Sequence, residues 1–224
     1  MLFRSENAAS GRILRKIYSK KPWLVGFSCY VWNAQKALEL ARKIKCRDKQ
    51  IITVFGGPEV TPLARQYAQK NRCIDFIVRG EGENTFPALL DALLRGGDAA
   101  LLKGVVFRTR GVVVDTGCAK PIENLAAVAS PHIGASAPLQ KTIACIETQR
   151  GCPFSCKYCF YSKRAGGLRF FPLERVKKEL VSILKRRPQK IYLMDPTFNA
   201  DRRRAAALCR FIAARNARRI PLRT

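Results

Sequence analysis

The sequence predicts an α/β protein built on parallel strands. Two observations lead to this prediction. First, short apolar runs alternate with amphipathic segments of helical period between residues 23 and 108. Second, glycines follow the ends of the apolar runs. Strands that alternate with helices connect through right-handed crossovers, which make neighbouring strands parallel. The alternation begins again after residue 142, so we expect two such units.

The first unit is expected to hold three strand–helix pairs and then a hairpin. The predicted strands are 23–28, 51–55 and 74–78, and the predicted helices are 34–45, 63–71 and 85–94. Two further apolar runs, 104–108 and 112–115, flank Gly111 and predict the hairpin. We place this first domain at residues 1–116.

A connection and a second series follow. Residues 117–141 contain Pro121, Pro131 and Pro138 with little periodicity, which is typical of an interdomain linker. The second domain, residues 142–224, is expected to contain strands at 143–147 and 190–195 and helices at 173–185 and 202–214. No third strand is predicted after the last helix.

Composition excludes several classes of protein. Apolar residues make up 47% and charged residues 26% of the 224 residues, which is typical of a folded globular chain. Charges interrupt every apolar run before the roughly 20 residues that a membrane-spanning helix needs, so we expect no membrane span. The first 21 residues lack the apolar stretch of a secretory signal, which predicts a cytoplasmic protein.

The chain is strongly basic. Lys and Arg total 42 against 16 Asp and Glu, a formal net charge of +26, and such a field attracts polyanions. The Arg-rich stretch 201–223 is spaced like the polar side of an amphipathic helix and has no interleaved aromatic platform. We interpret it as a solvated helix face, and nucleic acid is the less favoured partner.

Three of the nine cysteines lie close together, directly after the predicted strand 143–147. Cys152, Cys156 and Cys159 have the spacing Cys-x3-Cys-x2-Cys, with no further Cys or His nearby to complete a tetrahedral zinc site. Three thiolates can bind three irons of a cubane cluster and leave the fourth iron open. The spacing favours an iron–sulfur cluster, with zinc and a distant fourth ligand as the alternative. We expect the six scattered cysteines to be buried or partly buried thiols without a ligand role.

The cysteine loop resembles the signature of radical S-adenosylmethionine (SAM) enzymes, including Tyr158 directly before the third cysteine. The resemblance implies that Cys152, Cys156 and Cys159 bind a 4Fe-4S cluster whose free iron chelates SAM. Reduction by the cluster then cleaves SAM to methionine and a 5′-deoxyadenosyl radical. It also implies that SAM lies near Tyr158 and near Asp195, which begins the segment where the family usually has Gly-Gly-Glu.

Loops with small residues follow the three strands of the first domain. In an open parallel sheet the ligand lies beyond the carboxyl ends of the strands, where glycine lets the backbone approach it closely. The residues concerned are Ser28, Gly56, Gly57, Gly80 and Gly82. The 27 residues between Ser28 and Gly56 are similar to the serine and Gly-Gly spacing of cobalamin-binding domains. Together with the cysteine loop, these loops resemble the cobalamin-binding radical SAM class, relatives of the anaerobic magnesium-protoporphyrin ester cyclases.

This resemblance implies a Rossmann-like cobalamin-binding domain followed by the first βα units of a partial TIM-type radical SAM barrel. Only 27 residues precede Ser28, so the Asp-x-His-x-x-Gly loop that often accompanies such domains is absent, and the sole histidine, His132, lies in the linker. From Lys141 to Thr224 there are 84 residues, fewer than the roughly 200 that a six-unit barrel needs. We therefore expect a fragment or a truncated gene product.

The leading hypothesis is a radical SAM enzyme, or part of one, that acts on a small-molecule substrate. The resemblance implies cobalamin as methyl carrier and flavodoxin or ferredoxin as electron donor. One alternative is a radical enzyme that modifies RNA, related to transfer-RNA methylthiotransferases, although Cys29, Cys46 and Cys73 are not grouped as a second cluster site. Another is a non-catalytic protein that holds a cluster or cobalamin. The sequence assigns no catalytic residue.

Overall fold

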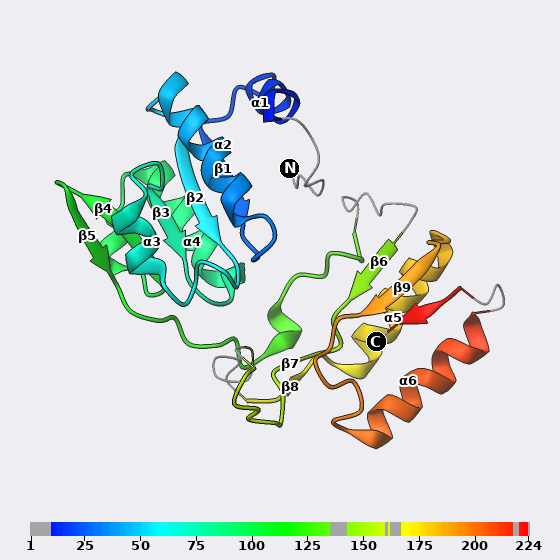
Figure 1. The fold of residues 1–224 in the computed structure, drawn as a ribbon. Coiled ribbons are helices and arrows are strands. Elements are labelled where there is room, and N and C mark those ends of the chain that lie inside the picture. Colours follow the sequence, from blue (N-terminus) through cyan, green and yellow to red (C-terminus); the bar gives the residue numbers. More distant parts are fainter. Residues whose placement is uncertain (1–9, 135–142, 160, 162–166, 217–219, 224) are drawn as a thin grey trace. The chain divides into compact units, whose positions relative to one another are not determined.

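The protein is described here by a computed structural model, which covers residues 10–134, 143–159, 161, 167–216 and 220–223. The chain divides between Lys120 and Pro121 into two compact units, each with its own sheet and core (Figure 1). This division falls inside the predicted linker. Within the described residues, none of the helices has the length and hydropathy that crossing a membrane requires.

The first unit is built on a five-stranded sheet with the order β1-β2-β3-β4-β5. Its strands are β1 (Leu24–Ser28), β2 (Ile52–Gly56), β3 (Phe76–Val78), β4 (Val105–Thr109) and β5 (Val112–Asp115). The first three are parallel, and the β4–β5 hairpin adds antiparallel to β3. The predicted parallel strands and the hairpin are therefore confirmed.

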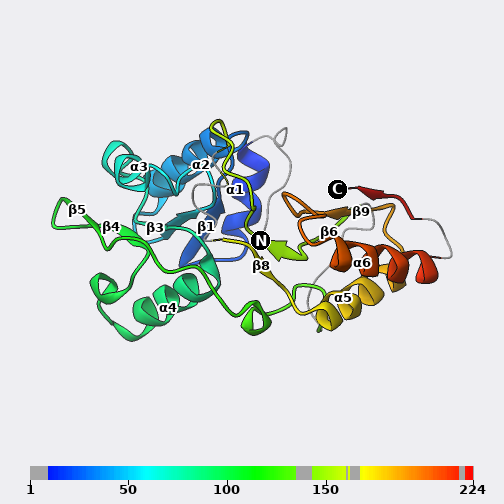
Figure 2. The same cartoon turned by 90° about the horizontal axis from the view of Figure 1, so that it is seen from below.

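Helices cover both faces of this sheet. α2 (Ala34–Arg47) and α3 (Ala64–Lys70) pack on one face, while α4 (Gly82–Arg95) packs on the other (Figure 2). Right-handed crossovers between the parallel strands carry α2 and α3 to the same side, whereas α4 leads into the antiparallel hairpin. The three predicted helices are present, with ends that differ by up to three residues.

A short helix, α1 (Ser10–Tyr18), precedes β1 and is absent from the predicted elements. Its Ile13 and Ile17, one turn apart, are buried against Leu40 and Ile44 of α2. This contact stabilises a helix of nine residues, which is too short to persist in water by itself.

The second unit has a three-stranded parallel sheet with the order β10-β9-β6. The strands β6 (Ile143–Ile146) and β9 (Lys190–Leu193) and the helices α5 (Leu173–Lys185) and α6 (Arg202–Arg215) confirm the predicted elements. β10 (Leu222–Arg223) pairs with β9, so the expectation that no third strand follows α6 is wrong.

α5 and α6 lie on the same side of this sheet (Figures 1 and 2). Alternate strand residues, Ala144, Ile146, Ile191 and Leu193, are buried in the core that includes these helices. Each strand lies beside the preceding one, with both helices on one face, which is the arrangement of consecutive units in a βα barrel. The predicted fold class is confirmed in both units.

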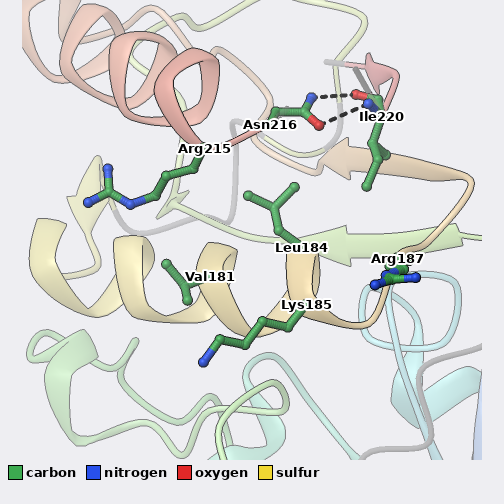
Figure 3. Close-up of a pocket in the computed structure, with 7 residues that line it drawn as sticks. All are labelled: Val181, Leu184, Lys185, Arg187, Arg215, Asn216 and Ile220. Carbon is green, nitrogen blue, oxygen red and sulfur yellow. Dashed lines mark hydrogen bonds between the residues drawn. The ribbon is translucent and has the colours of Figure 1, made fainter. Parts of the chain in front are cut away.

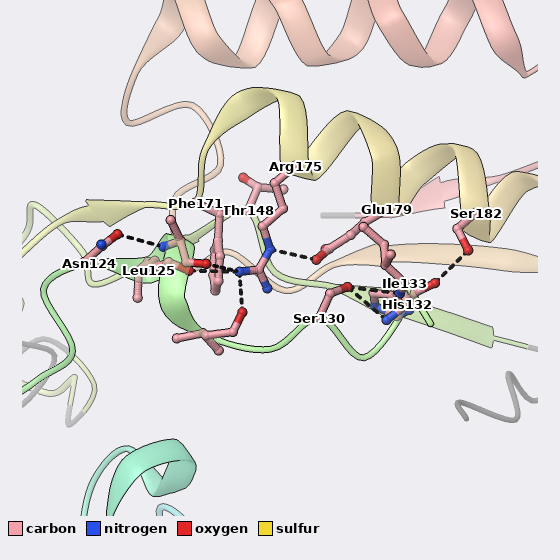
Figure 4. A network of polar contacts seen from close by, with 12 residues as sticks. Asn124, Leu125, Ser130, His132, Ile133, Thr148, Phe171, Arg175, Glu179 and Ser182 are labelled. Carbon is pink, nitrogen blue, oxygen red and sulfur yellow. Dashed lines mark hydrogen bonds and ion pairs between the residues drawn. The ribbon is translucent and has the colours of Figure 1, made fainter. Parts of the chain in front are cut away.

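The segment that follows Lys120 packs on the second unit, although the sequence predicts a linker here. Leu125 is 2% exposed and belongs to the core of this unit. Arg175 of α5 donates to the carbonyl oxygens of Leu125, at 2.9 Å, and of Val128, and it pairs with Glu179 at 3.0 Å (Figure 4). Arg175 supplies donors that these backbone carbonyls need once they are removed from water.

Candidate functional site

The residues predicted to bind cofactors fall into two groups, one in each unit. The first group lies where β1, β2 and β3 end. Ser28 is the last residue of β1 and pairs in register with Gly56, the last residue of β2. Gly57 follows directly, Gly80 follows β3, and Gly82 begins α4. The structure thus places all five predicted residues at the carboxyl edge of the parallel strands, where open α/β sheets bind ligands.

The first two loops of this edge touch through their backbones. The Cys29 N–H donates to the Gly56 carbonyl oxygen at 2.7 Å. Gly57 has a φ of +105°, and a Cβ there would lie 2.6 Å from the Cys29 carbonyl oxygen, so only glycine fits. Burial, aided by the charge of Glu59, raises the pKa of the Cys29 thiol to about 12. This thiol therefore stays protonated and is unsuited to bind a metal.

Thr61 joins the second and third loops. Its hydroxyl donates to the Gly57 carbonyl oxygen at 2.8 Å and accepts from the Gly80 N–H at 3.3 Å. Gly80 has a φ of +77°, and a Cβ there would meet no atom within 4 Å, so this part of the edge is bare backbone. Nothing in the sequence pattern singles out Thr61, because both of its partners are backbone atoms, one in its own loop and one in the loop after β3.

An aromatic pair stands in the loop that follows Ser28. The rings of Tyr30 and Trp32 stack with centroids 4.7 Å apart, and they are 38% and 63% exposed. Asn33 holds this loop by accepting from the Tyr30 N–H at 2.8 Å and donating to the Ser28 carbonyl oxygen at 3.0 Å. Bare backbone beside exposed aromatic rings fits a large cofactor with a flat apolar part and polar groups.

The second group follows β6. A two-stranded ribbon, β7 (Gln149–Arg150) and β8 (Arg169–Phe170), brings the chain back to the point where the cysteine loop begins. Cys152 and Cys159 are partly exposed and Cys156 is exposed, and none of the three forms a disulfide. These thiols are therefore available as ligands.

The described residues contain no group of three Cys, His, Asp or Glu side chains arranged to hold a single metal ion. In an iron–sulfur cluster, however, each thiolate binds its own iron, so the sulfur atoms stand further apart than around one ion. The Cys159 N–H donates to the Cys156 carbonyl oxygen at 3.0 Å, which makes a turn between these two cysteines. Three accessible thiols on one loop are a donor set that fits iron.

Asp195, two residues after the end of β9, holds the start of the cysteine loop. The side chain is 7% exposed, and its Oδ1 accepts from the N–H groups of Thr148, at 2.7 Å, and Gln149, at 3.1 Å. Its Oδ2 accepts from the Thr148 hydroxyl at 2.5 Å. The structure therefore gives Asp195 a backbone-holding role, and its predicted contact with SAM stays a prediction.

Arg204 of α6 reaches the same place. Its guanidinium donates to the carbonyl oxygens of Thr148, at 3.1 Å, and Phe171, at 2.6 Å, and lies over the Phe170 ring. It therefore bridges the residues just before and just after the β7–β8 ribbon. Burial lowers the pKa of Arg204 from its usual value. The prediction of a wholly solvated Arg face on this helix is wrong at this residue.

Other predicted residues near the loop have simpler surroundings. Tyr158 is 92% exposed, and its predicted place beside SAM stays a prediction. Glu147, at the end of the strand predicted at 143–147, pairs with Arg150 at 3.0 Å. His132 is buried in the second unit with its Nε2 2.9 Å from the Cys145 carbonyl oxygen. It is therefore a core histidine.

Comparison with known proteins supports the two-part arrangement. Residues 5–90, which contain all five small residues of the first group, match the B12 binding domain family. TokK of Streptomyces tokunonensis, a cobalamin-dependent radical SAM methyltransferase, is 30% identical over 189 residues, which cover 80% of this chain and 28% of TokK. The chain is thus a relative of the cobalamin-dependent radical SAM enzymes.

Two further matches fit this family. The anaerobic magnesium-protoporphyrin IX monomethyl ester cyclase of Rubrivivax gelatinosus is 27% identical, over 87% of this chain and 38% of the cyclase. The solved structure of OxsB, a cobalamin-dependent SAM radical enzyme with aqua-cobalamin and SAM bound, has a TM-score of 0.77 at 19% identity, over 94% of this chain and 31% of OxsB. The fold of this chain thus matches that of OxsB, and the chain spans about a third of the length of these relatives.

The second unit also contains a pocket away from the cysteine loop (Figure 3). It measures about 440 Å³ and lies near the C-terminal ends of α5 and α6, next to residues that include Lys185, Arg187 and Arg215. Asn216 closes one side through two hydrogen bonds with Ile220, at 2.8 and 2.9 Å. This is the amino edge of the parallel strands, where βα barrels do not place their catalytic groups.

Proposed function

We propose that this chain provides the cobalamin-binding domain and the cluster-binding part of the barrel of a radical SAM methyltransferase. One observation carries the proposal. The loop of Cys152, Cys156 and Cys159 follows a parallel strand of one unit, in a chain whose other unit matches the B12 binding domain. The likeness to TokK, a methyltransferase, favours methyl transfer with cobalamin as the methyl carrier.

In this proposal Cys152, Cys156 and Cys159 hold a 4Fe-4S cluster. When bound, the cluster supplies the electron that cleaves SAM to methionine and a 5′-deoxyadenosyl radical. The contribution of the chain is to fix the loop that carries the ligands. Asp195, after β9, and Arg204, on α6, do this because their hydrogen bonds reach the backbone three and four residues before the first cysteine.

The first unit would hold cobalamin at its carboxyl edge. Ser28, Gly56, Gly57, Gly80 and Gly82 form the bare backbone there, and the exposed rings of Tyr30 and Trp32 stand beside it. The glycines permit close approach by the polar tail of the cofactor. Since the sole histidine is engaged in the core of the second unit, cobalt would take no imidazole ligand from this chain.

The partners are part of the same proposal. A small molecule is the substrate, and a one-electron carrier such as flavodoxin or ferredoxin is the reductant. The net charge of +26 would attract an acidic carrier. Arg204, one of the arginines on α6, is engaged within the fold by two backbone carbonyl oxygens, which weakens the case for an RNA-binding face on this helix.

The test is anaerobic reconstitution of the full chain with iron and sulfide. We expect bound iron and sulfide in a 1:1 ratio, and 5′-deoxyadenosine after addition of SAM and dithionite. Cys156→Ala should lose both. Cys209→Ala, which removes an exposed thiol on α6 with no predicted role, should keep both. Hydroxocobalamin retained after desalting tests the first unit separately.

The outcomes separate the hypotheses. A chain that retains neither cluster nor cobalamin would overturn the proposal. A chain that retains both but forms no 5′-deoxyadenosine would favour the non-catalytic alternative. Binding of transfer RNA that weakens steeply with salt would favour the RNA-modifying alternative.

A further inference from the structure

The segment 195–199 lies against the cysteine loop. β6 and β9 are adjacent and parallel, with Ile146 opposite Leu193, so the residues that follow each strand emerge at the same edge of the sheet. The third residue of this segment, Thr197, has a contact of its own with the cysteine loop.

Thr197 is held in place from the side of the loop. Gln149, which is buried, donates from its side-chain Nε2 to the Thr197 carbonyl oxygen at 2.7 Å. The backbone of Gln149 is in turn fixed by Asp195, whose Oδ1 accepts its N–H at 3.1 Å. These two hydrogen bonds therefore fix the segment after β9 against the start of the cysteine loop.

The Thr197 hydroxyl lies 3.3 Å from the sulfur of Cys152, the first of the three clustered cysteines. Either atom can donate while the cysteine is a thiol. A metal-bound cysteine is a thiolate without a proton, so only the hydroxyl can donate in that state. The contact then becomes an O–H···S hydrogen bond to a cluster ligand.

We propose that Thr197 is a positioning residue that, through this hydrogen bond to the Cys152 sulfur, raises the reduction potential of the cluster. The inference rests on the proposed function, which places the cluster on this cysteine. Reduction adds one negative charge to the cluster, and a donor to a ligand sulfur stabilises the more negative state. The hydroxyl therefore favours the reduced form, which is the form that donates an electron to SAM.

The test compares three variants of the full chain after anaerobic reconstitution. Thr197→Val removes the hydroxyl and keeps the branched shape. Thr197→Ser keeps the hydroxyl, and Ser155→Ala removes an exposed hydroxyl within the same loop. The measurement is a potentiometric titration of the cluster followed by electron paramagnetic resonance, with iron content and circular dichroism to establish loading and folding.

We expect Thr197→Val to shift the equilibrium between reduced and oxidised cluster about tenfold toward oxidised, which is about 59 mV for a one-electron couple. Thr197→Ser and Ser155→Ala should titrate as the wild type does. A folded Thr197→Val that loses its cluster, while Thr197→Ser retains it, would also support a role for the hydroxyl.

An unchanged potential in a loaded Thr197→Val overturns this inference and leaves the proposed function intact. Loss of the cluster in both Thr197 variants also overturns it, because packing of the methyl group would then be the cause. A wild-type chain that takes up no cluster overturns the inference together with the proposed function.

Discussion

The carboxylate of Asp195 holds Thr148 by two hydrogen bonds, one from its N–H at 2.7 Å and one from its hydroxyl at 2.5 Å. In Asp195→Asn an NH₂ group replaces one of the two acceptor oxygens, and this group faces hydrogen-bond donors of Thr148 or Gln149. We expect a loss of about 2 kcal/mol in the free energy of unfolding, since a hydrogen bond to a charged group contributes about 1.5–3 kcal/mol. Urea unfolding of the apo chain measures it.

Asp201→Asn is the matched control for this change. Asp201 caps α6 by accepting from the Arg204 N–H at 3.0 Å, and asparagine caps helices about as well as aspartate. This variant should unfold near the wild-type urea concentration. Equal stability of the two variants would refute the role assigned to Asp195.

Gly57→Ala should disturb the carboxyl edge of the parallel strands in the first unit, where we propose that cobalamin binds. The new Cβ would lie 2.6 Å from the Cys29 carbonyl oxygen, on a residue with a φ of +105°. We expect destabilisation by about 3 kcal/mol and weaker retention of hydroxocobalamin. Gly26→Ala, where a Cβ meets no atom within 4 Å, should change both quantities little. A Gly57→Ala chain as stable as Gly26→Ala would contradict this account of the loop contact.

Arg175→Met should destabilise the second unit by about 3–5 kcal/mol, because it leaves Glu179 buried without its cation. It also removes the donor to the carbonyl oxygen of Leu125. The double variant Arg175→Met with Glu179→Leu should regain part of this loss, because the stranded carboxylate is gone. Urea unfolding of the two single variants and the double variant gives the coupling energy. A coupling near zero would argue against the pair.

His132 should make the second unit less stable in mild acid. Burial lowers the pKa of its imidazole below 6.5, against the opposing effect of Glu179. Between the folded pKa and 6.5 the unfolded chain binds more protons than the folded one, so stability rises with pH through this window and falls on acidification. The His132→Gln variant keeps an amide that can reach the Cys145 carbonyl oxygen but has no group that titrates here. Between pH 7.5 and 5.5 its urea midpoint should therefore decrease less than that of the wild type. Identical pH profiles would disprove the assignment.

The regular elements could be predicted because their periodicity reports burial. The strands and helices of both units follow alternations of apolar and polar residues that the cores require. α1 and β10 could not be predicted. α1 has nine residues and lies outside the strand–helix alternation, and β10 has two residues, too few to show a period. The prediction that the scattered cysteines are buried or partly buried is wrong for four of the six. Cys29 and Cys73 are buried, whereas Cys46, Cys118, Cys145 and Cys209 are exposed, since a single thiol carries no periodic signal.

The site could be predicted where function follows from local sequence. Small residues after strands and closely spaced cysteines are local patterns, and the structure places both groups after parallel strands. Their roles as cofactor ligands stay predictions. The supporting contacts are not local. Asp195 and Thr148 are 47 positions apart, and Arg204 lies 56 positions from the same threonine, within a run of arginines that otherwise suggests solvent. Only the pairing of β6 with β9 brings these residues together.

The pairing of Arg150 with Arg169 across the β7–β8 ribbon closes the 18 residues between them into a loop with fixed ends. Closing a flexible loop of this length costs roughly 2.6 kcal/mol of chain entropy beyond a constant term. Folding of the unit meets that cost in the absence of any metal. The proposed cluster would then assemble on a loop whose ends are already fixed, so its assembly and loss would be local events.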